Sequence, residues 1–257
     1  MSSTIWTQDA LSSSAVRMRA KLWRVVEAQH RVSTMKLVDS LAEQEILEEI
    51  LESTKPPVPE ACRDLDYLLF TPFRYGAAYP AGSRFRRAGF TEGVFYASAS
   101  PDVAMTEMAF YRLLFFAESP ETPIPKNAAD YTALAVRIAS ERALDLTKPP
   151  LNAHSALWMK HNDYTDCQAL ADGARAVDVT AIRYASVRDH KHRPNYAVLS
   201  CRAFADRAPI ARQSWKMHIR AEGVLAICEA PAASLTLTAE SFKDDERILP
   251  FLTRKAL

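Results

Sequence analysis

Glycine is scarce in this sequence, with six residues in a chain of 257, where average usage would give roughly 18. No two of the six stand three or five positions apart, so neither G-x-G-x-x-G nor G-x-x-x-x-G-K-[ST] can be written anywhere in the chain. A Rossmann dinucleotide loop and a Walker A loop are therefore excluded. Four of the glycines fall within one short stretch: Gly76, Gly82, Gly89 and Gly93.

Paired cysteines and long apolar runs are also lacking. The four cysteines are far apart and form no C-x-x-C pair, so we expect buried free thiols and neither a zinc site nor a disulfide framework. No window approaches 18 uninterrupted apolar residues, and the first residues lack the basic-then-apolar order of a secretory signal. We therefore expect a cytoplasmic protein with no membrane partner.

An excess of charge of either sign is missing, since 32 Lys+Arg stand against 31 Asp+Glu. This balance argues against direct nucleic-acid binding as the main role of the protein, so any charge-driven function must be local. With 48% hydrophobic residues, the composition is that of a globular protein with one domain and an appendage.

Two regions are expected along the chain. Residues 1–55 have the apolar and charged pattern of amphipathic helices, and the proline-rich run at 55–59 cannot continue a helix. We therefore predict a helical N-terminal extension over residues 1–60 and a main domain over 61–257. The extension is equally suited to an oligomer contact, to a partner protein, or to packing on its own domain.

In the main domain, short strand patterns alternate with helical ones, without the regular βαβ rhythm of a doubly wound sheet. Ser100-Pro101-Asp102 predicts the start of a helix that runs to about Phe116, and a second helix is expected at 165–177. Strands are expected at 94–97, 132–138, 181–184, 196–201, 215–219, 224–228 and 235–238. The prediction is a compact α+β fold with a mixed sheet.

The stretch between Tyr67 and Thr91 contains four arginines and neither a lysine nor an acid: Arg74, Arg84, Arg86 and Arg87. Arginine donors suit phosphate oxygens, and the neighbouring glycines and aromatic residues allow close approach and stacking. The composition favours a nucleotide ligand, while a solvated basic loop explains it equally well.

Glu107 is the other singular residue, because its helical neighbours Val103, Ala104 and Phe110 are apolar. An acid on such a face has either a catalytic duty or a structural partner, for which the nearby arginines are candidates.

Thr165 and Gln168 fit a capping box, which is also a possible anion site. His190 and His192 lack the further ligands of a metal site and are expected to be exposed loop residues.

Several of these segments, in this order, resemble the RES domain, which is named for its arginine, glutamate and serine. The segments are Thr71–Tyr75, Gly82–Phe85, Gly93–Ser98, Ala104–Glu107, Asp163–Gln168 and Ile182–Asp189, so the resemblance covers roughly residues 62–206. It implies a fold similar to that of ADP-ribosyltransferase toxins. It also implies an enzyme that consumes NAD+ by breaking the nicotinamide–ribose bond, as the toxin of a pair with an Xre-type antitoxin. NAD+ would then be a substrate, and no cofactor or metal is expected.

Carried onto this chain, the resemblance implies a catalytic group of Glu107, Arg74 and Ser186. The NAD+-binding positions would be Arg74, Tyr75, Arg84, Tyr96, Thr165 and Ser186. Glu107 would stabilise the positive charge that develops on the ribose, and the arginines would hold the diphosphate.

The acceptor of the ADP-ribose stays open between water, inorganic phosphate and a protein side chain. A nucleotide-binding module without turnover and a nucleic-acid-binding protein are the alternatives from other classes.

Overall fold

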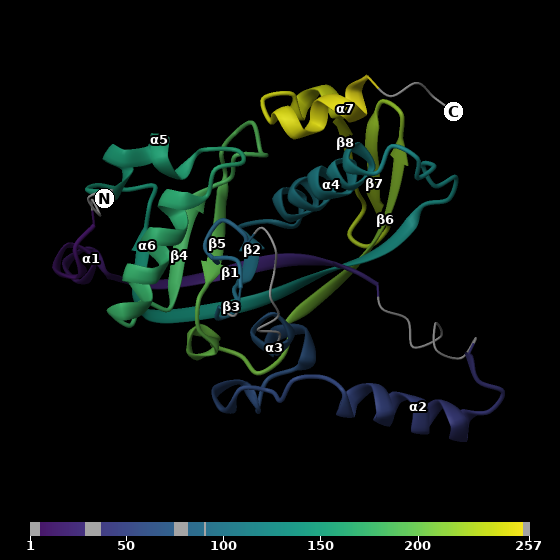
Figure 1. The fold of residues 1–257 in the computed structure, drawn as a ribbon, viewed down its shortest axis with the longest axis horizontal. Coiled ribbons are helices and arrows are strands. Elements are labelled where there is room, and N and C mark those ends of the chain that lie inside the picture. The colour runs from purple at the N-terminus through teal and green to yellow at the C-terminus, as the bar shows by residue number, and fades with distance from the viewer. Residues whose placement is uncertain (1–5, 29–36, 75–81, 90, 254–257) are drawn as a thin grey trace.

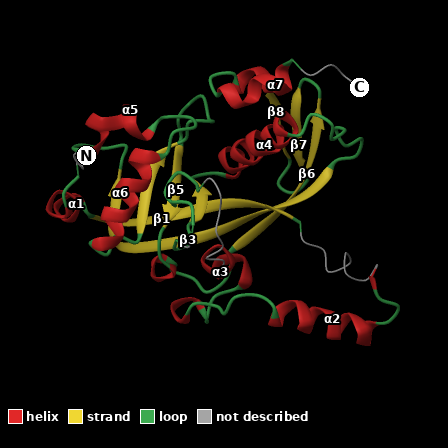
Figure 2. Cartoon of the chain, viewed as in Figure 1, coloured by secondary structure: helices red, strands yellow, loops and turns green. Residues whose placement is uncertain are grey.

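The computed structural model describes residues 6–28, 37–74, 82–89 and 91–253 of the chain. These residues form a mixed α+β structure in which helices surround one large sheet (Figure 1; Figure 2). The helices are α1 (Gln8–Ser14), α2 (Leu41–Ser53), α3 (Tyr67–Arg74), α4 (Pro101–Glu118), α5 (Ser155–Trp158), α6 (Thr165–Ala176) and α7 (Leu249–Leu252). The strands are β1 (Val16–Glu27), β2 (Phe95–Ser98), β3 (Ala129–Asp145), β4 (Ala181–Ala185), β5 (Pro194–Val198), β6 (Ala211–Arg220), β7 (Gly223–Cys228) and β8 (Ala233–Thr238).

The strands pair in the order β1-β2-β5-β4-β3-β6-β7-β8, and β1 also pairs with β3. The first five strands therefore close into a ring of pairings, from which β6, β7 and β8 extend as an antiparallel wing. Strand β3 belongs to both parts, because its first half pairs with β6 and its last residues pair in parallel with β4. One long strand thus connects the ring to the wing.

The helices cover the sheet in two groups. Helix α4 packs on β1 and on the wing, and α7 packs on α4, whereas α1 and α5 pack on α6, which lies beside β4 (Figure 1). Each group has its own apolar core, which includes Phe110 and Trp215 on the wing side and Trp158 and Leu170 on the other. Helix α2 lies at the lower edge of Figure 1, apart from the sheet.

The expected helices of the main domain are confirmed as α4 and α6, and each expected strand corresponds to one of β2 to β8. Helix α4 begins after Ser100 with Pro101 at its first position, as the local sequence predicts. These elements were predictable because alternation of apolar and polar residues, or a 3.6-residue repeat, is a local property.

The prediction of an entirely helical N-terminal extension is wrong at residues 16–27, which form β1. Arg17, Arg19 and Lys21 alternate with apolar residues, and this period of two is typical of a strand. Strand β1 pairs with β3 along its whole length and buries Leu22 against the sheet. Part of the expected appendage is therefore a structural strand of the ring.

The expectation of four free cysteines is also wrong, because Cys62 and Cys201 form a disulfide, while Cys167 and Cys228 are free and buried. The bridge joins two short 3-10 helices, Glu60–Cys62 and Cys201–Ala203, across 139 residues of sequence. No local spacing reveals a pair so far apart in the chain.

Gly93 has a steric role at the entrance to β2. A Cβ at this position would lie 1.9 Å from the carbonyl oxygen of Pro72 in α3. Only glycine permits this close approach of two backbone segments. The contact therefore sets the position of α3, and with it that of Arg74, against the sheet.

We predict that Gly93→Ala lowers the free energy of unfolding by roughly 1–3 kcal/mol, because the methyl group forces α3 away from the sheet. Denaturant unfolding measures the change. Gly173→Ala is the matched control, since its Cβ would meet only the end of the Leu11 side chain. Equal stabilities of the two variants would contradict the steric role of Gly93.

Candidate active site

Glu107 lies half-buried in the middle of α4, and one of its carboxylate oxygens accepts two short hydrogen bonds. Ser186 Oγ and Asn195 Nδ2 each donate to Glu107 Oε1 at 2.6 Å. Within the described part of the chain, Oε2 has no hydrogen-bond partner. The carboxylate is thus held firmly through one oxygen, while the other remains for a ligand.

Asn195 belongs to a row of residues that crosses three neighbouring strands. In the sheet register it is paired with Ser98 of β2 on one side and with Tyr184 of β4 on the other, so the three side chains share a face. Ser98 Oγ donates to Asn195 Oδ1 at 2.7 Å, and both residues are only 3% exposed. The amide is therefore fixed with its nitrogen towards Glu107.

Ser186 is fully buried in the turn that follows β4. Its Oγ accepts hydrogen bonds from the backbone N–H groups of Arg188 at 3.1 Å and Asp189 at 3.0 Å, and donates its hydrogen to Glu107. Because its lone pairs and its hydrogen are both engaged, the hydroxyl acts on Glu107 as a positioning group.

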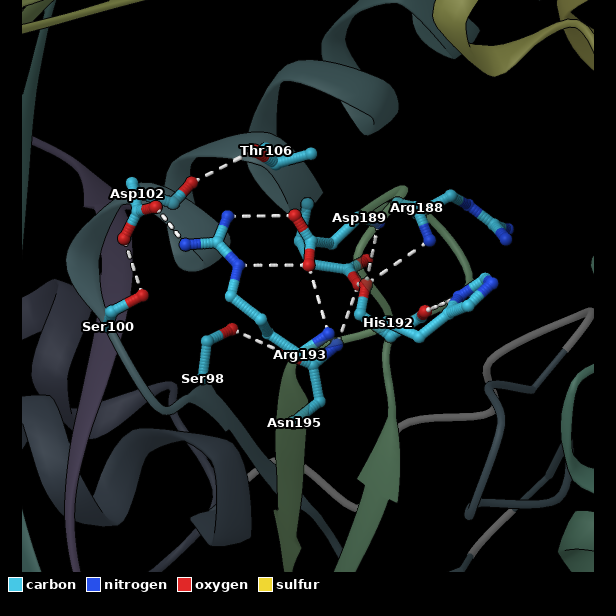
Figure 3. A network of polar contacts seen from close by, with 11 residues as sticks. Ser98, Ser100, Asp102, Thr106, Arg188, Asp189, His192, Arg193 and Asn195 are labelled. Atoms are coloured by element: carbon cyan, nitrogen blue, oxygen red, sulfur yellow. Dashed lines mark hydrogen bonds and ion pairs between the residues drawn. The ribbon is translucent and has the colours of Figure 1, made fainter. Parts of the chain in front are cut away.

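Arg193 clamps this turn to the beginning of α4. Its guanidinium pairs with Asp102 in the first turn of α4 and, at 2.7 Å, with Asp189 in the turn after Ser186 (Figure 3). Its backbone N–H also donates to Asp189 Oδ2 at 2.9 Å. The helix that contains Glu107 and the turn that contains Ser186 are therefore joined by one cation.

Two tyrosines, Tyr111 and Tyr184, lie within electrostatic reach of Glu107. Burial is the main reason why the pKa of Tyr184 lies well above its usual value, and the charge of Glu107 raises it further. Partial burial and the neighbouring Tyr164 and Glu107 raise the pKa of Tyr111, whose side chain is half-exposed. Both phenols therefore stay neutral at physiological pH.

Tyr96, a predicted ligand-binding residue, organises the loop of residues 82–89, here called the glycine-rich loop. Its hydroxyl accepts the Phe85 N–H at 2.8 Å and lies 2.8 Å from Ser83 Oγ. Burial raises the pKa of Tyr96 to about 12. Gln168 of α6 donates to the carbonyl oxygens of Ser83 at 3.0 Å and Arg86 at 3.1 Å, so the loop is held from two sides.

Arg84 is buried, which does not fit a solvated basic loop. It donates to the carbonyl oxygens of Trp158 at 2.6 Å and Lys160 at 2.9 Å, and its guanidinium lies 4.8 Å from the Tyr164 ring centroid. No carboxylate pairs with Arg84 among the residues that the structure describes. Its positive charge is therefore not neutralised by a described carboxylate.

Arg74 has a different environment, at the end of α3. It pairs with Glu52 of α2 at 2.5 Å and donates to the carbonyl oxygen of Pro56 at 2.5 Å. The structure does not bring it into contact with Glu107, so the alternative of an ion pair between them does not hold. Tyr75, the other predicted residue of this motif, lies outside the described residues.

Thr165 is exposed at the first position of α6, and its N–H donates to Asp163 Oδ1 at 3.0 Å. The predicted capping box is wrong, because Asp163 provides this bond and Gln168 binds the glycine-rich loop instead.

His190 and His192 are exposed in their loop, as expected. In the described ranges, no group of three or more His, Cys, Asp or Glu side chains is arranged to hold a metal ion.

Comparison with known protein families identifies one family that matches this chain. The RES domain matches residues 57–220, which is more than half of the chain. This chain belongs to the RES domain family. The predicted resemblance is thereby confirmed, and Glu107 and Ser186 both lie within the matched region. No curated protein sequence matches the chain.

Among solved structures, the RES chain is similar to one in the M. tuberculosis MbcT–MbcA toxin–antitoxin complex. The two share 14% sequence identity with a TM-score of 0.48, and the match covers 82% of this chain and 90% of the other. No helix in the described part of this RES chain is long and apolar enough to span a membrane.

The structure therefore brings Glu107 and Ser186 together and adds Asn195, Ser98 and Arg193, which sequence reasoning missed. Asn195 and Ser98 have no local signal, because each is a single polar residue in a short strand. Arg193 is part of a visibly basic loop, but its two acidic partners are 4 and 91 positions away.

The acidic partners of Arg193 predict the response of stability to low pH. Burial alone would raise the pKa of Asp102 and Asp189, but hydrogen bonds and the positive charge of Arg193 outweigh it and hold both below 3.8. A carboxyl whose pKa is lowered by folding stabilises the fold above its unfolded pKa, and this contribution is lost as the pH falls through the folded pKa.

We therefore expect the free energy of unfolding to decrease as the pH falls below about 4. Asp189→Asn will be less stable at neutral pH, but its stability will depend less on pH in this range. Denaturant titrations between acidic and neutral pH measure both slopes. Glu118→Gln, an exposed change on α4, should retain the original slope. An unchanged slope for Asp189→Asn would contradict this account.

The polar row predicts energetic coupling. Removal of either Ser98 or Asn195 leaves a buried partner unsatisfied, so each alanine variant should lose roughly 1–3 kcal/mol of stability. The double variant should lose less than the sum of the two, by about 0.5 kcal/mol or more. Strict additivity in this double-mutant cycle would show that the two side chains act independently.

Proposed function

We propose that this protein is an NAD+-consuming enzyme that cleaves the nicotinamide–ribose bond, and that it acts as the toxin of a toxin–antitoxin pair. Membership of the RES family supports the assignment to this class. The observation that carries the proposal is Glu107, a half-buried carboxylate with one oxygen fixed by Ser186 and Asn195 and the other open.

Cleavage of the nicotinamide–ribose bond needs a fixed, charged carboxylate such as that of Glu107. Loss of nicotinamide from NAD+ leaves positive charge on the ribose, and a fixed carboxylate stabilises that charge in the transition state. Nicotinamide leaves as a neutral molecule, so no acid is required to protonate it. In this proposal Glu107 is the catalytic residue, and Ser186 and Asn195 are positioning residues.

The arginines are proposed to serve the diphosphate. Arg84 suits this role, because it is buried, has no described carboxylate partner and lies over Tyr164. Arg74 would have to exchange Glu52 for the ligand. Tyr96 would act through the loop that it holds, and Thr165 would orient a hydroxyl or amide group of the ligand. Water, inorganic phosphate or a protein side chain would accept the ADP-ribose.

The arginines that a nucleic-acid-binding role would need are largely engaged with acids. Arg183 pairs with Asp145 at 3.0 Å, and Arg193 pairs with two aspartates. Such ion pairs leave little free positive charge for phosphate backbones.

The proposed antitoxin partner is an Xre-type helix-turn-helix protein, as the family resemblance implies.

We predict that Glu107→Gln keeps its fold but consumes NAD+ at least about 100-fold more slowly, since the neutral amide cannot stabilise the ribose cation. Release of nicotinamide by purified protein, with and without inorganic phosphate, measures turnover and identifies the acceptor. Glu118→Gln, on the exposed side of the same helix, is the control and should turn over normally.

Unchanged turnover in Glu107→Gln would contradict the role of the carboxylate. NAD+ binding without cleavage by the unmodified protein would instead identify a nucleotide-binding module. For the toxin role, expression of the protein should arrest growth, and expression of Glu107→Gln should not.

A further inference from the structure

Arg188 is a buried cation whose hydrogen-bonding capacity is only partly used. Its side chain is 3% exposed and lies 4.0 Å from the ring centroid of Phe110. Nη2 pairs with Asp245 at 2.9 Å and donates to the carbonyl oxygen of His161 at 2.9 Å. Nε and Nη1 are also buried, and within the described residues neither has a hydrogen-bond partner. Unpaired buried donors are costly, so they indicate an acceptor that joins them.

The position of Arg188 is next to the candidate active site. Its backbone N–H donates to Ser186 Oγ, the same atom that donates to Glu107. Phe110, on which the guanidinium lies, is three residues after Glu107 on α4. The Tyr111 phenol lies within the electrostatic reach of both Glu107 and Arg188. The unpaired donors therefore belong to the surroundings of Glu107.

Two further arginines gather at this place on adjacent backbone carbonyls. Arg247 donates to the His161 oxygen at 3.2 Å, and Arg84 donates to the Lys160 oxygen at 2.9 Å. Asp245 pairs with both Arg188 and Arg247, at 2.9 Å and 2.7 Å, and is the carboxylate that the described contacts provide for these guanidiniums. Asp245 thus serves two of the three guanidiniums, and within the described residues no carboxylate pairs with Arg84.

We infer that Arg188 contacts the ligand directly, with Nε and Nη1 donating to phosphoryl oxygens. This inference rests on the proposed function, which provides two sources of such oxygens: the diphosphate of NAD+ and inorganic phosphate as the acceptor. Phosphoryl oxygens are strong, negatively charged acceptors for guanidinium N–H groups. Arg188 lies in the segment Ile182–Asp189 that carries the family resemblance, but it is not among the site residues that the resemblance implies.

The test compares Arg188→Lys with the unmodified protein. Lysine keeps the positive charge beside Asp245 but lacks the Nε and Nη1 donors. Calorimetric titration with ADP-ribose and, separately, with inorganic phosphate measures binding without turnover. We expect about tenfold or greater weakening for at least one probe. Weakening for ADP-ribose identifies the diphosphate as the source, and weakening for inorganic phosphate alone identifies the acceptor.

Arg183→Lys is the matched control, because Arg183 also has a buried nitrogen without a described partner but pairs with Asp145 away from Glu107. It should bind both probes normally. Thermal unfolding of each variant, with and without the probes, separates a loss of contact from a loss of fold, since a folded variant that has lost the contact is no longer stabilised by the probe.

The inference would be overturned if Arg188→Lys bound both probes as tightly as the unmodified protein. It would also be overturned if the unmodified protein bound neither probe. Failure of the proposed function looks different. In that case the unmodified protein binds ADP-ribose through Arg188 but leaves NAD+ intact.

Discussion

The two hydrogen bonds to Oε1 of Glu107 are the interaction on which the rest of the site depends. A carboxylate on an apolar helix face is costly to bury, and the neutral donors of Ser186 and Asn195 offset that cost without cancelling its charge. An arginine in their place would satisfy Glu107 but neutralise it. The charge therefore remains available to a ligand at Oε2.

The fold serves this arrangement by bringing three separate elements to one carboxylate. Helix α4 provides Glu107, the turn after β4 provides Ser186, and β5 provides Asn195, which Ser98 of β2 holds in place. Arg193 joins the turn to the start of α4. The strands involved belong to the closed ring, where each is paired on both sides, so the side chains have little freedom to move relative to one another.

The arginines divide into different roles that composition does not distinguish. Arg74 is tied to α2 through Glu52, and Arg87 is paired with Asp172 of α6 at 2.5 Å. Arg84 supports the loop near Lys160, and Arg188, from a different part of the sequence, presents unpaired donors beside the candidate active site. The basic stretch between Tyr67 and Thr91 thus combines arginines that hold the structure together with Arg84, which has no described carboxylate partner.

The amino-acid sequence by itself determined most of the helices and strands, because their signals are local repeats of 2 or 3.6 residues, and it singled out Glu107 as an acid on an apolar face. The ordered motifs also sufficed to place the chain in its family. Only the tertiary structure decided that Asn195 and Ser186 hold Glu107, that Cys62 pairs with Cys201, and that Arg188 keeps unpaired donors. These contacts join residues 79, 88 and 139 positions apart, or depend on what surrounds a buried group. Packing of distant elements sets them, and no local pattern encodes that packing.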